Sequence, residues 1–280
     1  MTPVLRFIGV GWTFFWRQPA LVRAAALLVF LPLLASYVLS VPFGDYGPES
    51  VAVLVVLHLA AIVLLMWGMA CVLTVGKRLL QAKSGRTRTS FRAVQAQARA
   101  LIVPLLLTDI LRACITLLWA LPLLVAMVGF AVYLDDSNLL SGLTWRQGAA
   151  EHPWLWLVPP AFVALAIPPI HYLLRTVLAP FVVAYEKIAF RPALSRSAQL
   201  TKGRLPYTLL VSVLLMLLWL PGMAASALVG MALPADAAMV VDPPVAAFFD
   251  TFSLVLWLLA FTQYFKALGG KTKAAAGDDE

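Results

Sequence analysis

The chain has 280 residues, of which 62% are apolar and only 12% are charged. Soluble globular domains have about 45–50% apolar and about 25% charged residues, so the composition excludes a soluble globular protein. The net charge is +8, but the basic residues flank long apolar runs, where membrane topology explains them and nucleic-acid binding is not needed.

The first segment, residues 3–17, is predicted to be an interfacial amphipathic helix. Val4, Ile8, Gly11 and Phe15 fall on one helical face, and the segment is too short and too charged to cross a bilayer. Pro19 then ends this helix and can begin the next one.

Six apolar runs are long enough for transmembrane helices, which need about 20 residues each. The chain is therefore predicted to be an all-α polytopic membrane protein with one six-helix domain, residues 1–266, and short interfacial amphipathic helices. The tail, 267–280, is polar, built of small residues and predicted to be disordered and cytoplasmic. The six predicted spans are about 24–43, 51–75, 100–133, 154–183, 205–233 and 244–266.

The charges in the gaps between spans predict the orientation of the chain. The gaps 76–99 and 184–204 hold seven and five basic residues, and the alternate gaps together hold one basic residue against seven acidic ones. Cytoplasmic loops accumulate Lys and Arg. Both termini are therefore expected in the cytoplasm, with the chain in the inner (plasma) membrane of a bacterium.

Both basic gaps contain segments with helical periodicity. Residues 91–102 carry an apolar stripe after Ser90, a suitable N-cap, and Pro192 and Gly203 bound a similar segment over 192–202. Each is predicted to be a short helix that lies in the cytoplasmic headgroups.

Four ionisable residues lie inside predicted spans at similar depth. Asp109 and Arg112 share a face of the third span, and His171 and Arg175 share a face of the fourth. Such groups are costly in hydrocarbon and are usually paired or functional. In one interpretation Asp109 and Arg112 form an intrahelical ion pair, and Arg175 separately snorkels to the cytoplasmic surface. In the other, the four residues form a candidate binding or conduction site.

A second polar pair is expected nearer the opposite side of the membrane. His58 in the second span and Asp250 in the sixth have similar predicted depth. Their contact would either be a hydrogen bond that joins the two helices or orient the His58 imidazole for proton transfer.

The fourth span carries Pro159-Pro160, Pro168-Pro169 and Pro180. Each proline removes a backbone donor and clashes with the preceding turn, so this helix is predicted to be kinked or interrupted. Broken helices line the substrate sites of many transporters, although proline is also common in membrane helices.

The fifth span contains Gly222, Ser226 and Gly230 at four-residue spacing. Such a stripe lets two helices approach closely. It predicts a contact either within the chain or with a second copy, as in a homo-oligomer.

Motifs for enzymatic chemistry are absent from the sequence. There is no phosphate-binding loop, no zinc-protease or nucleophile-elbow motif and no acidic cluster for a divalent cation. Cys71 and Cys114 lie in apolar runs without metal-ligand spacing. The sequence predicts no cofactor, no metal and no enzyme.

The two basic segments resemble one known family. The first segment contains Gly85, Ser90 and the run F-R-A-V-Q-A-Q-A-R. The second contains A-P-F-V-V-A-Y-E at 179–186, A-L-S-R-S at 193–197 and L-T-K-G at 200–203. Together they resemble the bacterial membrane-domain family associated with glycerophosphodiester phosphodiesterases. The resemblance covers roughly 76–215. It implies a six-helix membrane module, fused in some members to a phosphodiesterase barrel that these 280 residues do not contain.

Two functions remain open from the sequence. The first is a non-enzymatic inner-membrane protein that organises lipid or protein partners, with anionic headgroups bound by its basic cytoplasmic helices. The alternative is a small transporter or lipid translocator that uses Asp109, Arg112, His171 and Arg175. An enzyme acting on lipid headgroups is the least favoured hypothesis.

Overall fold

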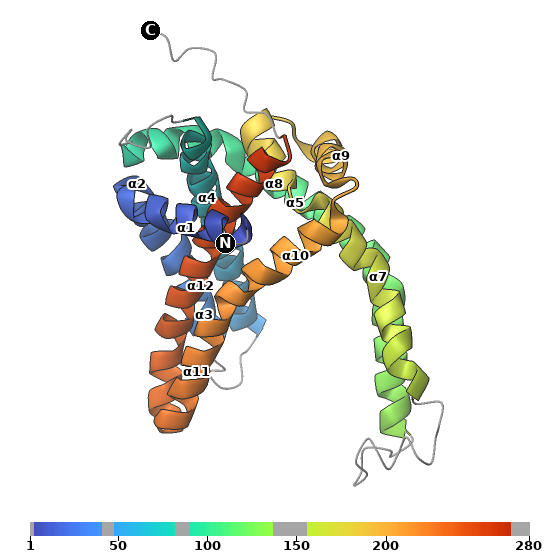
Figure 1. Ribbon diagram of the computed structural model, residues 1–280. Coiled ribbons are helices and arrows are strands. Elements are labelled where there is room, and N and C mark those ends of the chain that lie inside the picture. The colour runs from blue at the N-terminus through green and yellow to red at the C-terminus, as the bar shows by residue number, and fades with distance from the viewer. Residues whose placement is uncertain (1–2, 41–47, 82–89, 137–155, 270–280) are drawn as a thin grey trace.

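The computed structural model describes residues 3–40, 48–81, 90–136 and 156–269, which are helical with short connections (Figure 1). Six helical segments are long and apolar enough to cross a membrane, which confirms the predicted all-α polytopic class. The six segments are Pro19–Val38, Val53–Lys77, Phe91–Tyr133, Val158–Glu186, Leu205–Ala232 and Asp236–Ala267.

The predicted helix at the N-terminus is α1, Pro3–Arg17. It packs on the last helix, α12 (Ala235–Ala267), where a Cβ on Gly11 would lie only 3.2 Å from the Cβ of Leu259. The Trp12 ring lies 5.0 Å from the Phe252 ring, centroid to centroid. The buried face of α1 is therefore the predicted one, with Gly11 at the closest approach.

The first two spans form a close pair beside α12. The first consists of α2 (Pro19–Ala25), a π-helical turn (Ala26–Phe30) and α3 (Leu31–Ser40). The second is α4, Pro48–Gln81. A Cβ on Gly68 of α4 would lie 2.5 Å from the carbonyl oxygen of Leu28, so only glycine permits this approach.

The third span differs from its prediction. Residues 91–102 are not a separate headgroup helix but the first turns of α5, Phe91–Asp136, which is 46 residues long. No glycine or proline interrupts the chain before Pro104, so the helix continues. At about 1.5 Å per residue it would be about 69 Å long, more than twice the hydrocarbon thickness of about 30 Å. Figure 1 shows how this length is placed: α5 bends and then descends beside α7 (Val158–Thr176).

The fourth span is interrupted, as its prolines predicted. After α7 come α8 (Ala179–Phe181), a π-helical turn η3 (Val182–Glu186) and the short helix α9 (Phe190–Thr201). The prediction of a short helix over 192–202 is confirmed by α9, which is followed by Gly203 with a φ of +75°. The chain then continues through α10 (Leu205–Met216), the 3₁₀ turn η4 (Leu217–Trp219) and α11 (Leu220–Ala232) to α12.

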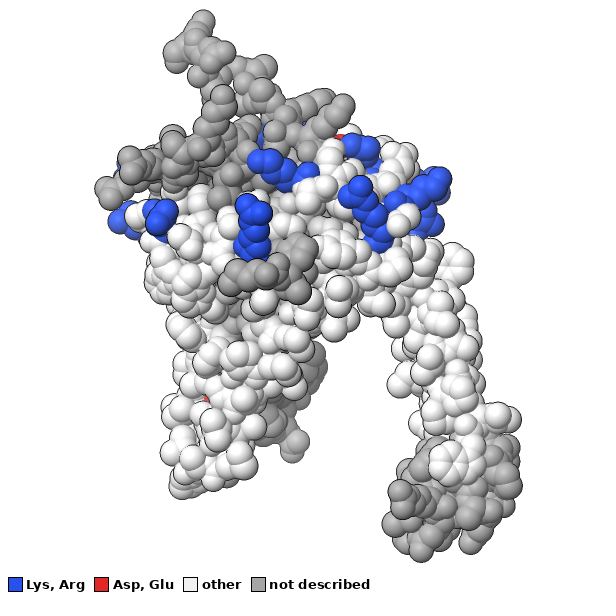
Figure 2. Space-filling view, viewed as in Figure 1, with Lys and Arg blue, Asp and Glu red and all other residues white. Residues whose placement is uncertain are grey.

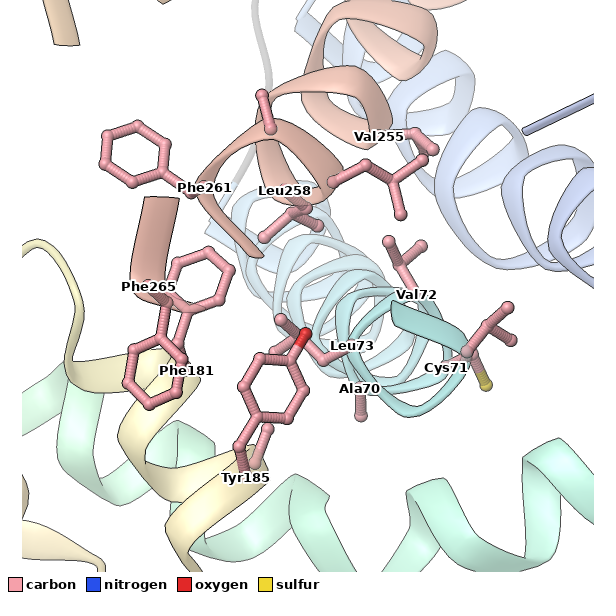
Figure 3. Close-up of a cluster of buried hydrophobic side chains, with 14 of the residues drawn as sticks. Ala70, Cys71, Val72, Leu73, Phe181, Tyr185, Val255, Leu258, Phe261 and Phe265 are labelled. Atoms are coloured by element: carbon pink, nitrogen blue, oxygen red, sulfur yellow. The ribbon is translucent and has the colours of Figure 1, made fainter. Parts of the chain in front are cut away.

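The core lies around the C-terminal half of α12. Figure 3 shows Phe181 beside Phe261 and Phe265, with Tyr185 next to them over Leu73 of α4. The Tyr185 hydroxyl hydrogen-bonds to the Thr262 hydroxyl over 2.7 Å, so the phenol is satisfied inside the protein. This core ties the end of the interrupted fourth span to the first and second spans.

The spans form two separate groups. The C-terminal part of α5 and the N-terminal part of α7 form an arm, in which the centroids of the Phe130 and Phe162 rings lie 5.8 Å apart. Helices α1–α4, α11 and α12 form a bundle, and Figure 2 shows an open hollow between arm and bundle. Lys and Arg side chains visible in Figure 2 gather at the end where arm and bundle meet, which is called the basic end below.

Candidate functional site

The break in the fourth span lies at Val177 and Leu178, between α7 and α8. Pro180 has no N–H to donate and its ring clashes with the carbonyl four residues earlier, at Thr176. The α-helix ends here, and backbone groups on both sides of the break lose their helical partners. The other prolines do not interrupt α7: Pro159 and Pro160 lie in its first turn, and Pro168 and Pro169 lie inside it.

Helix α9 supplies the missing partners. Ser197, which is completely buried, accepts a hydrogen bond from the Leu178 N–H over 3.1 Å and donates one to the Arg175 carbonyl over 2.9 Å. The hydroxyl of Thr201, also completely buried, lies 3.3 Å from the same carbonyl. One helix at the basic end therefore satisfies backbone groups on both sides of the break.

Two further contacts hold α9 in place. The Arg196 guanidinium forms a two-point ion pair with Glu186, with N–O distances of 3.0 and 3.3 Å, and Glu186 is only 6% exposed. The Phe190 N–H donates to the Thr108 hydroxyl of α5 over 2.9 Å. Helix α9 is thus fixed to the end of the fourth span and to the third span at the same time.

The turn between η3 and α9 has a strained backbone. Lys187 has a φ of +55° and Phe190 a φ of +60°, values that disfavour residues with a side chain. The contacts of Glu186 and of the Phe190 N–H, on either side of the turn, hold this conformation. Both side chains are exposed.

Exposed basic residues surround α9. Lys187, Arg191, Lys202 and Arg204 form what is called the α9 basic surface. None of them has an acidic partner among the residues that the structure describes. Figures 1 and 2, which share one viewpoint, show basic side chains where α9 lies.

Of the four predicted intramembrane site residues, the structure joins two. Arg112 Nη2 lies 2.9 Å from Asp109 Oδ1, which confirms the predicted ion pair, although the contact lacks the alignment of a hydrogen bond. The side chain of His171 is exposed, and neither it nor that of Arg175 has a hydrogen bond or ion pair with another described residue. Arg175 instead contributes its carbonyl to the α9 contact.

Sequence reasoning missed a tyrosine beside the ion pair. The Tyr172 hydroxyl is buried, has no hydrogen-bond partner among the described residues and is within electrostatic range of Arg112. Tyr172 directly follows His171 on α7, but it is half-buried whereas His171 is exposed, so the tyrosine and not the histidine faces the interior near Arg112. The sequence signal that pointed to this region was the end of the helix at Thr176, one turn after Tyr172.

The predicted contact between His58 and Asp250 is wrong. The Tyr37 hydroxyl donates to the Asp250 carboxylate, and the His58 ring hydrogen-bonds to the Leu54 carbonyl of its own helix over 2.8 Å. The physical reason is that α3 lies beside α12 and brings Tyr37 to Asp250, a pairing that depth alone does not predict.

The small-residue stripe of the fifth span is used partly inside the chain. A Cβ on Gly222 would lie 2.8 Å from the Cβ of Phe249 on α12, whereas a Cβ on Gly230 would have no atom within 4 Å. Ser226 lies between them and is half-buried. A homo-oligomer through this stripe stays a prediction.

Comparison of the chain with protein-family models, curated proteins and solved structures found no match. Among the described residues, no group of three or more His, Cys, Asp and Glu side chains could hold a metal ion. The resemblance to the phosphodiesterase-associated membrane family therefore stays a prediction. What the structure adds is a role for the residues that carry it, since Glu186, Arg196 and Ser197 all fix α9.

Ser197→Ala is expected to destabilise the protein by about 1–3 kcal/mol, because it leaves the Leu178 N–H without a partner and the Arg175 carbonyl with only the longer contact to Thr201. The matched control is Ser195→Ala, two residues earlier on the same helix, whose side chain is exposed; this change should cost less than about 0.5 kcal/mol. Thermal unfolding of the purified proteins in detergent measures both. Equal melting temperatures for the two variants would contradict the assigned role.

The Asp109–Arg112 pair predicts non-additive losses. Asp109→Ala leaves the Arg112 charge uncompensated in a low-dielectric setting and should cost about 2 kcal/mol, with partial exposure of the pair taken into account. The double variant Asp109→Ala/Arg112→Ala should recover much of that loss in the same unfolding measurement. Additive losses from the two single changes would show that the residues do not stabilise each other.

Proposed function

We propose that this chain is a non-enzymatic protein of the bacterial inner membrane that binds anionic lipid headgroups through its basic end. Both termini lie in the cytoplasm in this proposal. The observation that carries it is the α9 basic surface, where exposed charges lack acidic partners among the described residues.

Charge alone does not separate lipid binding from topology, because any multi-pass protein needs basic cytoplasmic loops. The arrangement of the charges supports lipid binding beyond what topology requires. The one acidic residue of the η3–α9 region, Glu186, is buried and neutralised by Arg196. Arg191 is exposed on α9, and Lys187 and Lys202 are exposed in the short connections at its two ends, so all three are held near one fixed helix.

The electrostatic attraction between these basic residues and anionic headgroups is large enough for selective lipid binding. Each Lys or Arg near an anionic membrane surface contributes about 1 kcal/mol. Four residues of the α9 basic surface would together contribute several kcal/mol before screening by salt. The same surface could hold anionic lipids around the protein and so organise partners in the membrane.

A transporter or lipid translocator is the second candidate, and one observation favours it. Two shielded oxygen atoms, Asp109 Oδ1 and Tyr172 Oη, have no hydrogen-bond partner among the described residues and lie near Arg112 inside the arm. Polar groups buried in this way are usually satisfied by water or a ligand. His171 and Arg175 would extend this polar region towards the basic end.

The proposed lipid binding predicts a headgroup preference. The purified protein, mixed with equal amounts of phosphatidylglycerol and phosphatidylcholine of the same acyl chains, should retain several phosphatidylglycerol molecules for each phosphatidylcholine in native mass spectrometry. Raising the salt before the lipids are exchanged should reduce this preference, because the attraction is electrostatic. Equal retention of the two lipids at low salt would refute the proposed function.

A further inference from the structure

We infer that the turn between η3 and α9 is a specific headgroup site, in which Lys187 and Arg191 bind the phosphate of an anionic phospholipid and Phe190 contacts its upper acyl chain. This inference rests on the proposed function and assigns it to one place in the fold.

The first support is the conformation of the turn. Two residues with side chains, Lys187 and Phe190, have left-handed φ values of +55° and +60°. Such strain persists only where the surroundings enforce it, and it concentrates at binding and functional sites. Here the Glu186–Arg196 ion pair and the hydrogen bond from the Phe190 N–H to Thr108 enforce it.

The second support is what the turn exposes. Phe190 is 47% exposed although it begins a helix whose other face is buried. Lys187 and Arg191, on either side of it, are also exposed. An aromatic ring between two cations matches the edge of a bilayer, where apolar groups lie just below the phosphates and cations lie beside them.

The third support is the local charge balance. The acidic residues nearest in the chain and across the α5 contact are Glu186 and Asp109, and each is already paired with an arginine. Lys187 and Arg191 have no acidic partner among the described residues. The turn therefore has two uncompensated positive charges for one phosphate group.

The exposed ring decides between the possible ligands. A free phosphate would use the two cations but gain nothing from Phe190, whereas a phospholipid uses all three side chains. An acidic segment of a protein partner would likewise pair with the two cations and leave the ring exposed to water. The turn directly follows the fourth span, where phospholipid headgroups are already present at high concentration.

Lipid titration of variants tests this site. Lys187→Asn/Arg191→Gln should weaken binding of phosphatidylglycerol to the full chain about thirtyfold in native mass spectrometry, since two cations of about 1 kcal/mol each are lost. Asparagine is used at 187 because it tolerates a positive φ. The control is Arg6→Gln/Arg92→Gln, which removes two exposed charges on α1 and α5, outside the α9 basic surface, and should change the affinity less than twofold.

Phe190→Gly separates binding from stability. Glycine relieves the strained φ, so the melting temperature should stay equal or rise by about 3 °C, while the phosphatidylglycerol affinity falls about threefold or more. A purely structural role for Phe190 would change the melting temperature and leave the affinity unchanged, and that result would overturn the inference.

The remaining outcomes are also decisive. If the wild-type protein shows no preference for phosphatidylglycerol, the proposed function fails. If that preference exists and Lys187→Asn/Arg191→Gln keeps it, or loses it no more than the control does, only the site assignment fails. Displacement of the lipid by millimolar inorganic phosphate would show a phosphate site without a lipid requirement and would overturn the role of the acyl chain.

Discussion

The fold depends on satisfying the backbone groups that lose their helical partners where the fourth span breaks, just before Pro180. Unsatisfied N–H and C=O groups cost several kcal/mol in hydrocarbon, so a break is tolerated only where other parts of the protein supply partners. Ser197 supplies them to the Leu178 N–H and the Arg175 carbonyl at once. The position of α9 follows from this requirement, and so do its ion pair with Glu186 and the display of its basic surface.

The same contact lies where the two parts of the molecule meet. The arm of α5 and α7 stands apart from the bundle over most of its length (Figures 1 and 2). At the basic end, α9 is bonded to α5 through Thr108 and to α7 through the Arg175 carbonyl. The core around Tyr185 then joins this region to α12 and α4. A change in α9 would therefore act on the arm and on the basic surface together.

Local patterns predicted much of this fold. Apolar runs separated by charged gaps gave the number of spans, and helical spacing gave α1, α9 and the Asp109–Arg112 pair, because these depend only on residues close in sequence. The break in the fourth span followed from proline chemistry. The continuity of α5 did not follow, because an amphipathic stripe before an apolar run is equally compatible with two helices or one.

Contacts between distant residues could not be predicted. Ser197 and Thr201 have the composition of an ordinary polar helix face, and only the neighbouring break gives them partners. Tyr37 reaches Asp250 across 213 residues of sequence, so His58 was the wrong partner at a plausible depth. Function was predicted least, since headgroup binding and membrane topology place the same residue types at the same membrane surface.

Thiol labelling of the two ends of the molecule tests most directly whether α9 and its basic surface face the cytoplasm. Single cysteines would replace Ser195 on α9 and Asp236 at the start of α12, both exposed, in a background where Cys71 and Cys114 are changed to alanine. In intact cells a membrane-impermeant maleimide should label Asp236→Cys, and it should label Ser195→Cys only after the membrane is permeabilised. Labelling of Ser195→Cys in intact cells would place α9 on the outer side and contradict the account.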